Sequence, residues 1–199
     1  QGDVRKALAQ LPDGLVDCVV TSPPYWGLRD YKIGPMICGG SDVCEHEWGT
    51  AIIKTHSGGT RHAVVGNNID DRIHYHNESQ FCSCGAWKGQ LGLEPTFQLY
   101  VQHIVEVFHQ LRRVLKKTGS LWLNLGDTYS SARVAPYSEQ YQHHTGRQTP
   151  EIEIQRAKVG DLPAKCLIGI PWRVALAMID DGWILRNSVI WSKPNHMPS

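Results

Sequence analysis

The sequence predicts an α/β fold whose sheet is mainly parallel. Three apolar segments of strand character, residues 16–22, 120–127 and 183–191, alternate with two segments of helical periodicity. A parallel connection needs a crossover that a helix supplies, so this alternation favours a parallel sheet. The chain has 199 residues, of which 41% are apolar, and this is enough for the core of one domain over 1–199.

The first predicted strand is the sequence VDCVVTS at residues 16–22. It is apolar and rich in β-branched residues, and the turn-forming sequences PDG and PP bound it on its two sides. Such a run is typical of a buried, central strand of a parallel sheet. A short helix after Gly2 and Asp3 is expected to lead into it.

The next periodic segment predicts a helix that begins at Pro95 and Thr96, because proline is tolerated in the first turn and apolar residues then recur at helical spacing. Lys116, Lys117 and Gly119 are typical of a helix C-terminus and predict where it ends.

Three later elements complete the predicted fold. SLWLNLGD at 120–127 is a second buried strand, 171–179 is a second long helix, and WILRNSVIW at 183–191 is a third strand.

Two stretches lack periodicity. Residues 27–92 are rich in Gly, His, Asn and Ser and hold four of the six cysteines, so they predict a loop-rich Cys/His-rich insertion tied by a metal. Residues 128–166 are polar and patternless, which predicts a mobile loop.

The insertion contains a candidate zinc site. Cys44 and His46 form one close pair of ligands, Cys82 and Cys84 form another, and a long loop joins the pairs. One residue separates the ligands of each pair, whereas zinc knuckles usually have two, and Cys38 is a possible substitute ligand. Structural zinc and free thiols both remain open at this point.

The sharpest chemical signal is Thr21-Ser22-Pro23-Pro24-Tyr25, directly after the first buried strand. Ligands of open α/β sheets bind at the carboxyl ends of strands. Two consecutive prolines are stiff and donate no hydrogen bond, so their carbonyl groups have fixed directions.

This arrangement suits methylation of an aromatic amine. The lone pair of such a nitrogen is delocalised, and two acceptors for its N–H groups would draw it toward tetrahedral geometry. The Ser22 hydroxyl and the Pro23 carbonyl can accept those hydrogen bonds. Tyr25 can stack on a base that has left its helix.

TSPPYW resembles the catalytic motif of the DNA amino-methyltransferases, in the permuted class found among phage and bacterial modification enzymes. LWLNLGD at 121–127, GIPWRVALAMIDDGW at 169–183 and IWSKPNHMPS at 190–199 resemble later blocks of that family, in order. Serine at the first motif position is typical of enzymes acting on cytosine N4, while adenine N6 remains open.

The resemblance implies a Rossmann-like methyltransferase fold, S-adenosylmethionine as cofactor, double-stranded DNA as substrate and a possible cognate restriction enzyme. It implies catalytic roles for Ser22, Pro23, Pro24 and Tyr25. By position it also implies cofactor contacts, which are assigned to Asp3, Thr21, Ser22 and Asp127. Two of these have structural alternatives: Asp3 as a turn residue and Asp127 as the cap of a following turn.

The family's Phe-x-Gly-x-Gly cofactor turn does not occur in the sequence. We therefore expect an incomplete catalytic domain, a fragment of the enzyme. A non-catalytic, zinc-containing DNA-binding module derived from a methyltransferase is the alternative. No cysteine follows a proline, which excludes the Pro-Cys nucleophile of cytosine C5 enzymes.

The composition sets few further limits. The net charge of +1 counts only weakly against DNA binding, since a basic surface can be local. No apolar run approaches the ~20 residues of a membrane helix, and the start of the sequence has no signal-peptide core, so a cytoplasmic protein is expected.

Overall fold

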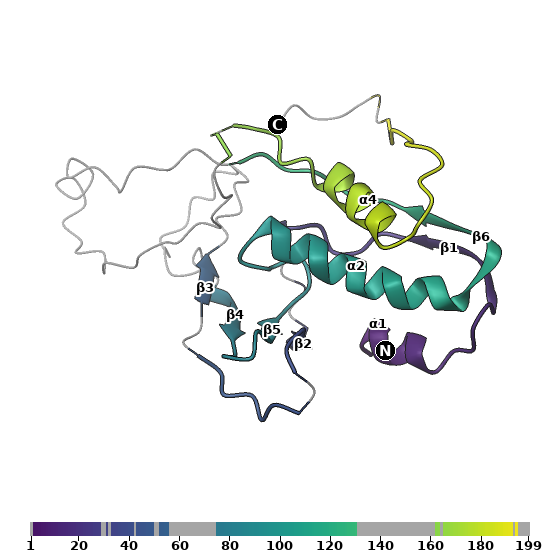
Figure 1. The fold of residues 1–199 in the computed structure, drawn as a ribbon. Coiled ribbons are helices and arrows are strands. Elements are labelled where there is room, and N and C mark those ends of the chain that lie inside the picture. The colour runs from purple at the N-terminus through teal and green to yellow at the C-terminus, as the bar shows by residue number, and fades with distance from the viewer. Residues whose placement is uncertain are drawn as a thin grey trace, which may run out of the picture.

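Helix α2, Phe97–Val114, is the element around which the others pack. It contacts α1 (Val4–Ala9), α4 (Ile170–Asp180) and β6 (Leu115–Leu123), as Figure 1 shows. The computed structural model describes residues 2–28, 31, 33–41, 43–49, 52–55, 75–130, 162–163, 165–192 and 194.

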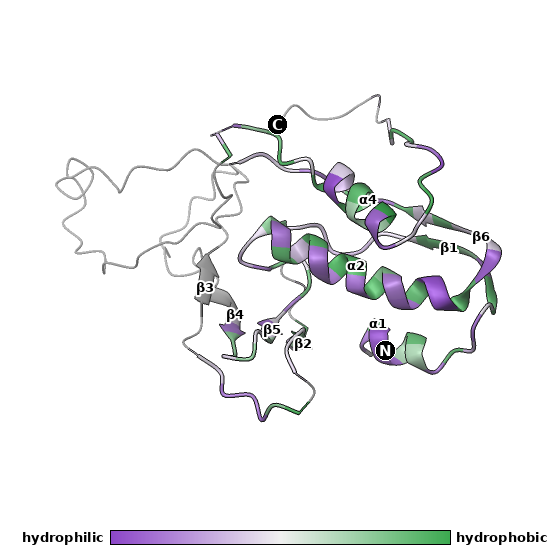
Figure 2. Ribbon diagram, in the orientation of Figure 1, coloured by the Kyte–Doolittle hydropathy of each residue, from purple (hydrophilic) through white to green (hydrophobic). Residues whose placement is uncertain are grey.

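The start of α2 is confirmed. Thr96 is its N-cap, and the Thr96 hydroxyl accepts a hydrogen bond from the Leu99 N–H over 3.2 Å. One face of the helix is buried and the opposite face is polar, which appears in Figure 2 as green and purple along the helix. The buried residues recur at helical spacing: Phe97, Tyr100, His103, Ile104, Phe108, Leu111 and Val114.

The predicted end of this helix was wrong. The helix ends at Val114, and Lys116, Lys117 and Gly119 lie in the strand β6 that follows directly. The loop after α1 stabilises this earlier end, because the Gly14 N–H donates to the Arg113 carbonyl over 3.0 Å.

Strands β1 (Val16–Thr21) and β6 form a parallel pair. Val20 lies opposite Trp122 in the register, and Thr21 lies opposite Leu123. Side chains alternate across a strand, so Val19, Leu121 and Leu123 pack against the core, while Val20 and Trp122 are exposed. The first strand and its parallel pairing are confirmed, but its predicted buried, central place was wrong: among the described strands β1 pairs with β6 alone, and one of its faces is exposed. The second strand begins and ends earlier than predicted.

The predicted third strand is a correction. Residues 183–192 are described and form no strand. A strand needs a neighbour for its backbone hydrogen bonds, and within the described residues the parallel sheet has two strands, β1 and β6. The apolar side chains from Ile184 to Trp191 are correspondingly exposed, about four-fifths in the case of Ile190 and Trp191 (80% each), whereas Trp183 packs against the core.

The insertion is richer in strands than predicted. Its described part forms a four-stranded antiparallel sheet, lying at the N-terminal end of α2 in Figure 1. The strand order is β2-β5-β4-β3, with β2 Met36–Cys38, β3 Ile52–Thr55, β4 Tyr75–Phe81 and β5 Trp87–Gly89. The described sheets are therefore one parallel pair and one four-stranded antiparallel sheet. The prediction that the strands pair mainly in parallel was wrong for the described residues.

Most of the predicted mobile loop at 128–166 lies outside the described residues, namely 131–161 and 164. Its two ends meet. The Ser130 N–H donates to the Cys166 carbonyl over 2.7 Å, and Tyr129 bridges to Leu167. The second predicted long helix, at 171–179, is confirmed as α4.

The hydrophobic core lies between the two long helices and the inner face of the parallel pair. Its fully buried members include Tyr100, Ile104 and Val174 (0% exposed). Within the described residues, no helix is both long and apolar enough to cross a membrane.

Candidate active site

The Ser-Pro-Pro-Tyr sequence follows the last residue of β1, as predicted. Ser22 is exposed, and its hydroxyl donates to the hydroxyl of Tyr25 over 3.3 Å. Pro23, Pro24 and Tyr25 are half-buried. The two side chains that were assigned to the target amine and the target base are therefore adjacent at the end of the strand.

Tyr100, on the buried face of α2, fixes the middle of this segment. Its hydroxyl donates to the Pro24 carbonyl over 2.8 Å. Burial raises the pKa of the Tyr100 phenol, so this hydroxyl remains a donor at neutral pH. The Pro24 carbonyl is thus engaged within the protein, which leaves the Pro23 carbonyl as the backbone acceptor assigned to the substrate.

Gly126 supports the ring of Tyr25. A Cβ atom on Gly126 would lie 2.6 Å from Cδ2 and 2.8 Å from Cε2 of that ring, which is closer than real contacts allow. The Tyr25 ring therefore rests against bare backbone in the segment after β6. The sequence analysis did not identify Gly126, although its place in the LWLNLGD block was a usable signal.

Trp26 and Gly27 anchor the far end of the motif. Trp26 is buried, packs edge-on against Phe97 and donates its indole N–H to the Glu94 carbonyl over 3.1 Å. The Gly27 N–H donates to the Gly92 carbonyl over 2.7 Å. The motif is consequently held by the segment that joins the insertion to α2, a contact that sequence patterns did not indicate.

Two predicted cofactor residues have structural partners. Asp3 is the N-cap of α1: its Oδ1 accepts the Arg5 N–H over 2.8 Å, and its Oδ2 pairs with the Arg5 guanidinium over 2.8 Å. This hydrogen bond to the Arg5 side chain holds the pKa of Asp3 below its ordinary value. In the structure the carboxylate thus caps a helix rather than ordering a turn, and its contact with the cofactor stays a prediction.

Asp127 caps α4 from another element. Its carboxylate accepts hydrogen bonds from the backbone N–H groups of Thr128, Gly169 and Ile170, at 2.8 to 3.1 Å. Gly169, the N-cap residue itself, has no side chain to do this. Thr21, the fourth predicted cofactor residue, ends β1, and its carbonyl accepts the Asn124 N–H over 2.9 Å.

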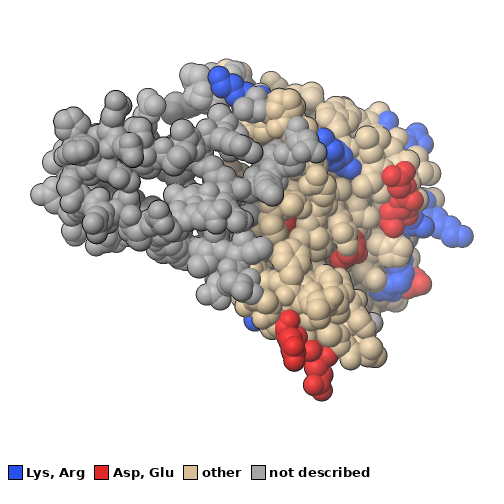
Figure 3. All heavy atoms as spheres, turned by 60° about the vertical axis from the view of Figure 1, so that its left-hand side comes forward, with Lys and Arg blue, Asp and Glu red and all other residues tan. Residues whose placement is uncertain are grey.

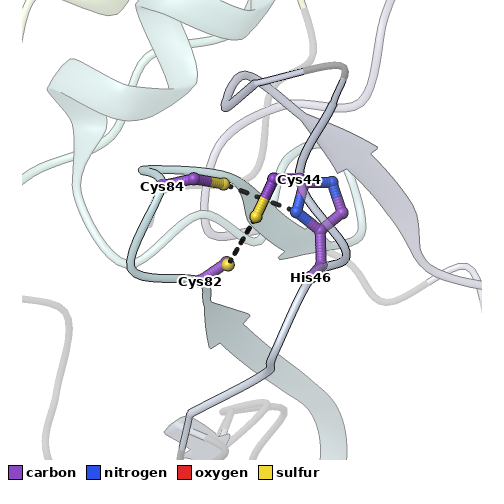
Figure 4. A group of neighbouring side chains, drawn as sticks. All are labelled: Cys44, His46, Cys82 and Cys84. Carbon is purple, nitrogen blue, oxygen red and sulfur yellow. Dashed lines mark hydrogen bonds between the residues drawn. The ribbon is translucent and has the colours of Figure 1, made fainter.

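The four predicted metal ligands converge. The ligand atoms of Cys44, His46, Cys82 and Cys84 all lie within 4.8 Å of one another, as Figure 4 shows. The Cys44 and Cys82 sulfurs are 3.8 Å apart, and the Cys84 sulfur is 3.4 Å from Nδ1 of His46. Cys38, the possible substitute ligand, lies apart from this cluster and accepts a hydrogen bond from Arg5 over 3.4 Å.

Close thiols cannot all ionise together, and their pKa values diverge here. A hydrogen bond from the Cys84 backbone N–H lowers the pKa of the Cys82 thiol to about 6. A hydrogen bond with Cys84 raises the pKa of Cys44 to about 11. The hydrogen bond with Cys82 raises the pKa of His46. The cluster thus already favours a thiolate at Cys82, the form that binds metals.

Charged side chains are dispersed on the face seen in Figure 3. The described Lys and Arg side chains stand apart or beside Asp and Glu, and they form no continuous basic area on that face. Two of the ion pairs in the structure are Lys116 with Asp17, at 2.7 Å, and Arg113 with Asp13. This matches the net charge of +1.

A match to a known family defines the class of the chain. The model of the DNA methylase family, N6_N4_Mtase, matches residues 16–199. The chain belongs to this family, which confirms the resemblance to DNA amino-methyltransferases.

Curated relatives give the comparison its detail. The chain is 34% identical over 203 residues to the Type II methyltransferase M.SmaI of Serratia marcescens, covering 99% of this chain and 48% of that protein. It is 33% identical over 198 residues to M.XycI of Xanthomonas campestris pv. cyanopsidis and 32% identical over 198 residues to M.Cfr9I of Citrobacter freundii. Each of these two alignments covers 100% of this chain and 47% of the relative. The chain thus spans about half the length of these relatives, and no solved structure matches it.

Proposed function

We propose that the chain forms the target-amine half of an S-adenosylmethionine-dependent DNA methyltransferase with a Rossmann-like fold, acting on an exocyclic amine of a flipped base. Cytosine N4 is the favoured target, because serine opens the motif. The observation that carries the proposal is Ser-Pro-Pro-Tyr at the carboxyl end of a parallel strand, held by Tyr100 and Gly126. The relatives' names, Type II methyltransferases, support double-stranded DNA as substrate and a cognate restriction enzyme as partner.

In this proposal each motif residue has a distinct task. The Ser22 hydroxyl and the Pro23 carbonyl accept hydrogen bonds from the two N–H groups of the amine, which concentrates the lone pair on nitrogen. The ring of Tyr25 stacks on the extruded base, a contact worth about 1–3 kcal/mol in other proteins. The cofactor, when bound, supplies an electrophilic methyl group. Asp3, Thr21 and Asp127 stay proposed cofactor contacts, although Asp3 and Asp127 also cap helices.

The test is the identity of the methylated base. The full-length natural protein is incubated with mixed-sequence DNA and S-adenosylmethionine carrying a labelled methyl group, and the nucleosides are separated by mass spectrometry. We expect label in N4-methylcytosine. Label in N6-methyladenine would keep the enzyme class and change the target, whereas label in 5-methylcytosine would contradict the mechanism.

The second candidate is a zinc-containing DNA-binding module without catalysis, which the Cys/His cluster favours. The same experiment separates the two. DNA binding without label in any base, by a protein that also fails to bind S-adenosylmethionine, would support the module and count against the enzyme.

We further propose that Cys44, His46, Cys82 and Cys84 hold a structural zinc ion. The donor set is the one zinc prefers. Tetrahedral zinc with Zn–S bonds of about 2.3 Å places two sulfurs about 3.8 Å apart, and the Cys44 and Cys82 sulfurs are separated by 3.8 Å. All positions of a four-ligand site come from the protein, which is typical of a structural rather than a catalytic ion.

Metal analysis of the purified protein tests this site. We expect about one zinc per chain, a much lower content in Cys82→Ser, and a lower melting temperature after chelation because metal binding is coupled to folding. Cys38→Ser and Cys18→Ser are the matched controls and should keep the zinc. A metal-free wild type expressed with ample zinc, or full retention by Cys82→Ser, would contradict the site.

A further inference from the structure

A fully buried glutamate lies between the insertion and the catalytic motif. Glu94 is 0% exposed and His103 is 2% exposed, and Oε1 of Glu94 lies 3.1 Å from Nδ1 of His103. A charged or polar pair at this depth is costly to bury unless its hydrogen bonds are satisfied. The proposed chemistry uses neither side chain, so their retention in the core calls for another role.

Glu94 organises the segment that holds the motif. Its Oε2 accepts the Gly92 N–H over 2.8 Å, and its own carbonyl accepts the Trp26 indole N–H over 3.1 Å. The Gly92 carbonyl in turn accepts the Gly27 N–H over 2.7 Å. Glu94 thereby fixes the two backbone carbonyls, its own and that of Gly92, that accept hydrogen bonds from the end of the motif.

Gly92 makes the contact with the motif close. A Cβ atom on Gly92 would lie 2.9 Å from Cβ of Pro24 and 3.2 Å from the Tyr25 carbonyl, and the backbone φ angle of +92° favours glycine. A shift of Gly92 is therefore transmitted directly to Pro24 and Tyr25, the residues on either side of the Pro24 carbonyl that Tyr100 holds.

The other side of the pair faces the insertion. The rings of His103 and Trp87 lie 4.8 Å apart and are tilted by 31°. Trp87 is fully buried, begins β5, and donates its indole N–H to the Ser79 hydroxyl over 2.9 Å. The turn that carries Cys82 and Cys84 leads into β5, and the Cys82 N–H donates to the Ala86 carbonyl over 2.8 Å, so the backbone of this turn connects the Cys/His cluster to Trp87, whose ring contacts His103.

We propose that Glu94, supported by His103, is a positioning residue that holds the Ser-Pro-Pro-Tyr motif in its reactive geometry through Gly92 and Trp26. The catalytic part of this inference rests on the proposed methyltransferase function. Glu94 touches neither base nor cofactor in this scheme. It acts by fixing the positions of the Pro23 carbonyl and the Tyr25 ring. A displacement of either group would lower the rate of the chemical step.

Hydrogen exchange tests the linkage without any activity. In the wild-type protein the Gly92 and Gly27 amides should have similar protection against exchange. The hydrogen bond from Gly27 to the Gly92 carbonyl depends on the hydrogen bond that Gly92 donates to Glu94, so both should open together. Glu94→Leu leaves the Gly92 N–H buried and unpaired, so we expect both amides to exchange about tenfold faster or more. The amides of β1 and β6 serve as internal controls and should keep their protection.

Glu94→Gln is the matched variant. Its amide oxygen can accept the Gly92 N–H, and its NH₂ group can donate to Nδ1 of His103 when that nitrogen carries no proton. Hydrogen-exchange protection and methylation should therefore be close to wild type. In the full-length natural protein, Glu94→Leu should lower kcat about tenfold or more and leave the KM for S-adenosylmethionine nearly unchanged.

Two results would overturn the inference. One is an unchanged exchange rate of the Gly27 amide in a folded Glu94→Leu variant. The other is unequal protection of the Gly27 and Gly92 amides in the wild-type protein. The second result decides the question even if Glu94→Leu does not fold. A wild-type protein with no methylation of any base would defeat the proposed function but leave the exchange result to decide the linkage.

Discussion

Ser22→Ala should reduce the methylation rate by about two orders of magnitude or more, the loss expected when one hydrogen bond that strengthens in the transition state is removed. The substitution deletes one hydroxyl from an exposed side chain at the end of β1, and its partner in the structure is the Tyr25 hydroxyl at 3.3 Å. Exposed positions of this kind change stability by within about 0.5 kcal/mol. The effect should therefore appear in kcat, measured by single-turnover methyl transfer to DNA, with the melting temperature unchanged.

Ser120→Ala is the matched control for this variant. Ser120 is an exposed serine on the adjacent strand, opposite Cys18 in the register, and the proposed reaction does not use it. It should methylate DNA at the wild-type rate. Wild-type turnover by Ser22→Ala would remove Ser22 from the mechanism, and equal losses in both variants would indicate a general defect of the strand pair.

Gly126→Ala should lower kcat/KM for DNA about ten- to hundredfold, the loss expected when a base no longer stacks on its aromatic partner. The added methyl group would lie 2.6 Å from the Tyr25 ring, so the ring must leave its present position. Because the change acts on the base and not on the cofactor, the affinity for S-adenosylmethionine should be retained. Calorimetric titration of the cofactor and steady-state methylation together measure both quantities.

A double-mutant cycle makes the second prediction specific. If Gly126→Ala acts only through the ring, adding it to Tyr25→Ala should cost little beyond Tyr25→Ala alone. Gly34→Ala is the control, since a Cβ atom there would meet nothing within 4 Å. Additive losses in the double variant would show that Gly126 has a role independent of Tyr25.

Much of the site was predictable because its signals are local. The strand before the motif, the helix that starts at Thr96 and the helix at 171–179 follow from apolar periodicity and capping residues, which operate over a few residues. The four candidate zinc ligands followed from residue type and spacing, and their ligand atoms converge in the structure. Cys38 had to be placed by the fold, because spacing alone did not separate it from the others.

The errors have a common physical cause. The segment 183–191 has the composition of a strand, but a strand forms only where a neighbour accepts its hydrogen bonds, and composition does not show that neighbour. The long helix ended early because Gly14, about a hundred residues away in sequence, satisfies its terminal carbonyl. The strands of the insertion carried too little periodicity to be distinguished from loop.

The sequence by itself determined the family, the motif residues Ser22 to Tyr25 and the candidate zinc ligands, since each depends on residue identity in a short window. The tertiary structure alone decided what surrounds them. Tyr100 and Gly126 contact the motif although they are distant from it in sequence. The carboxylates of Asp3 and Asp127 cap the N-termini of helices. Such contacts depend on how helices and strands pack, and packing joins residues whose separation in sequence carries no pattern.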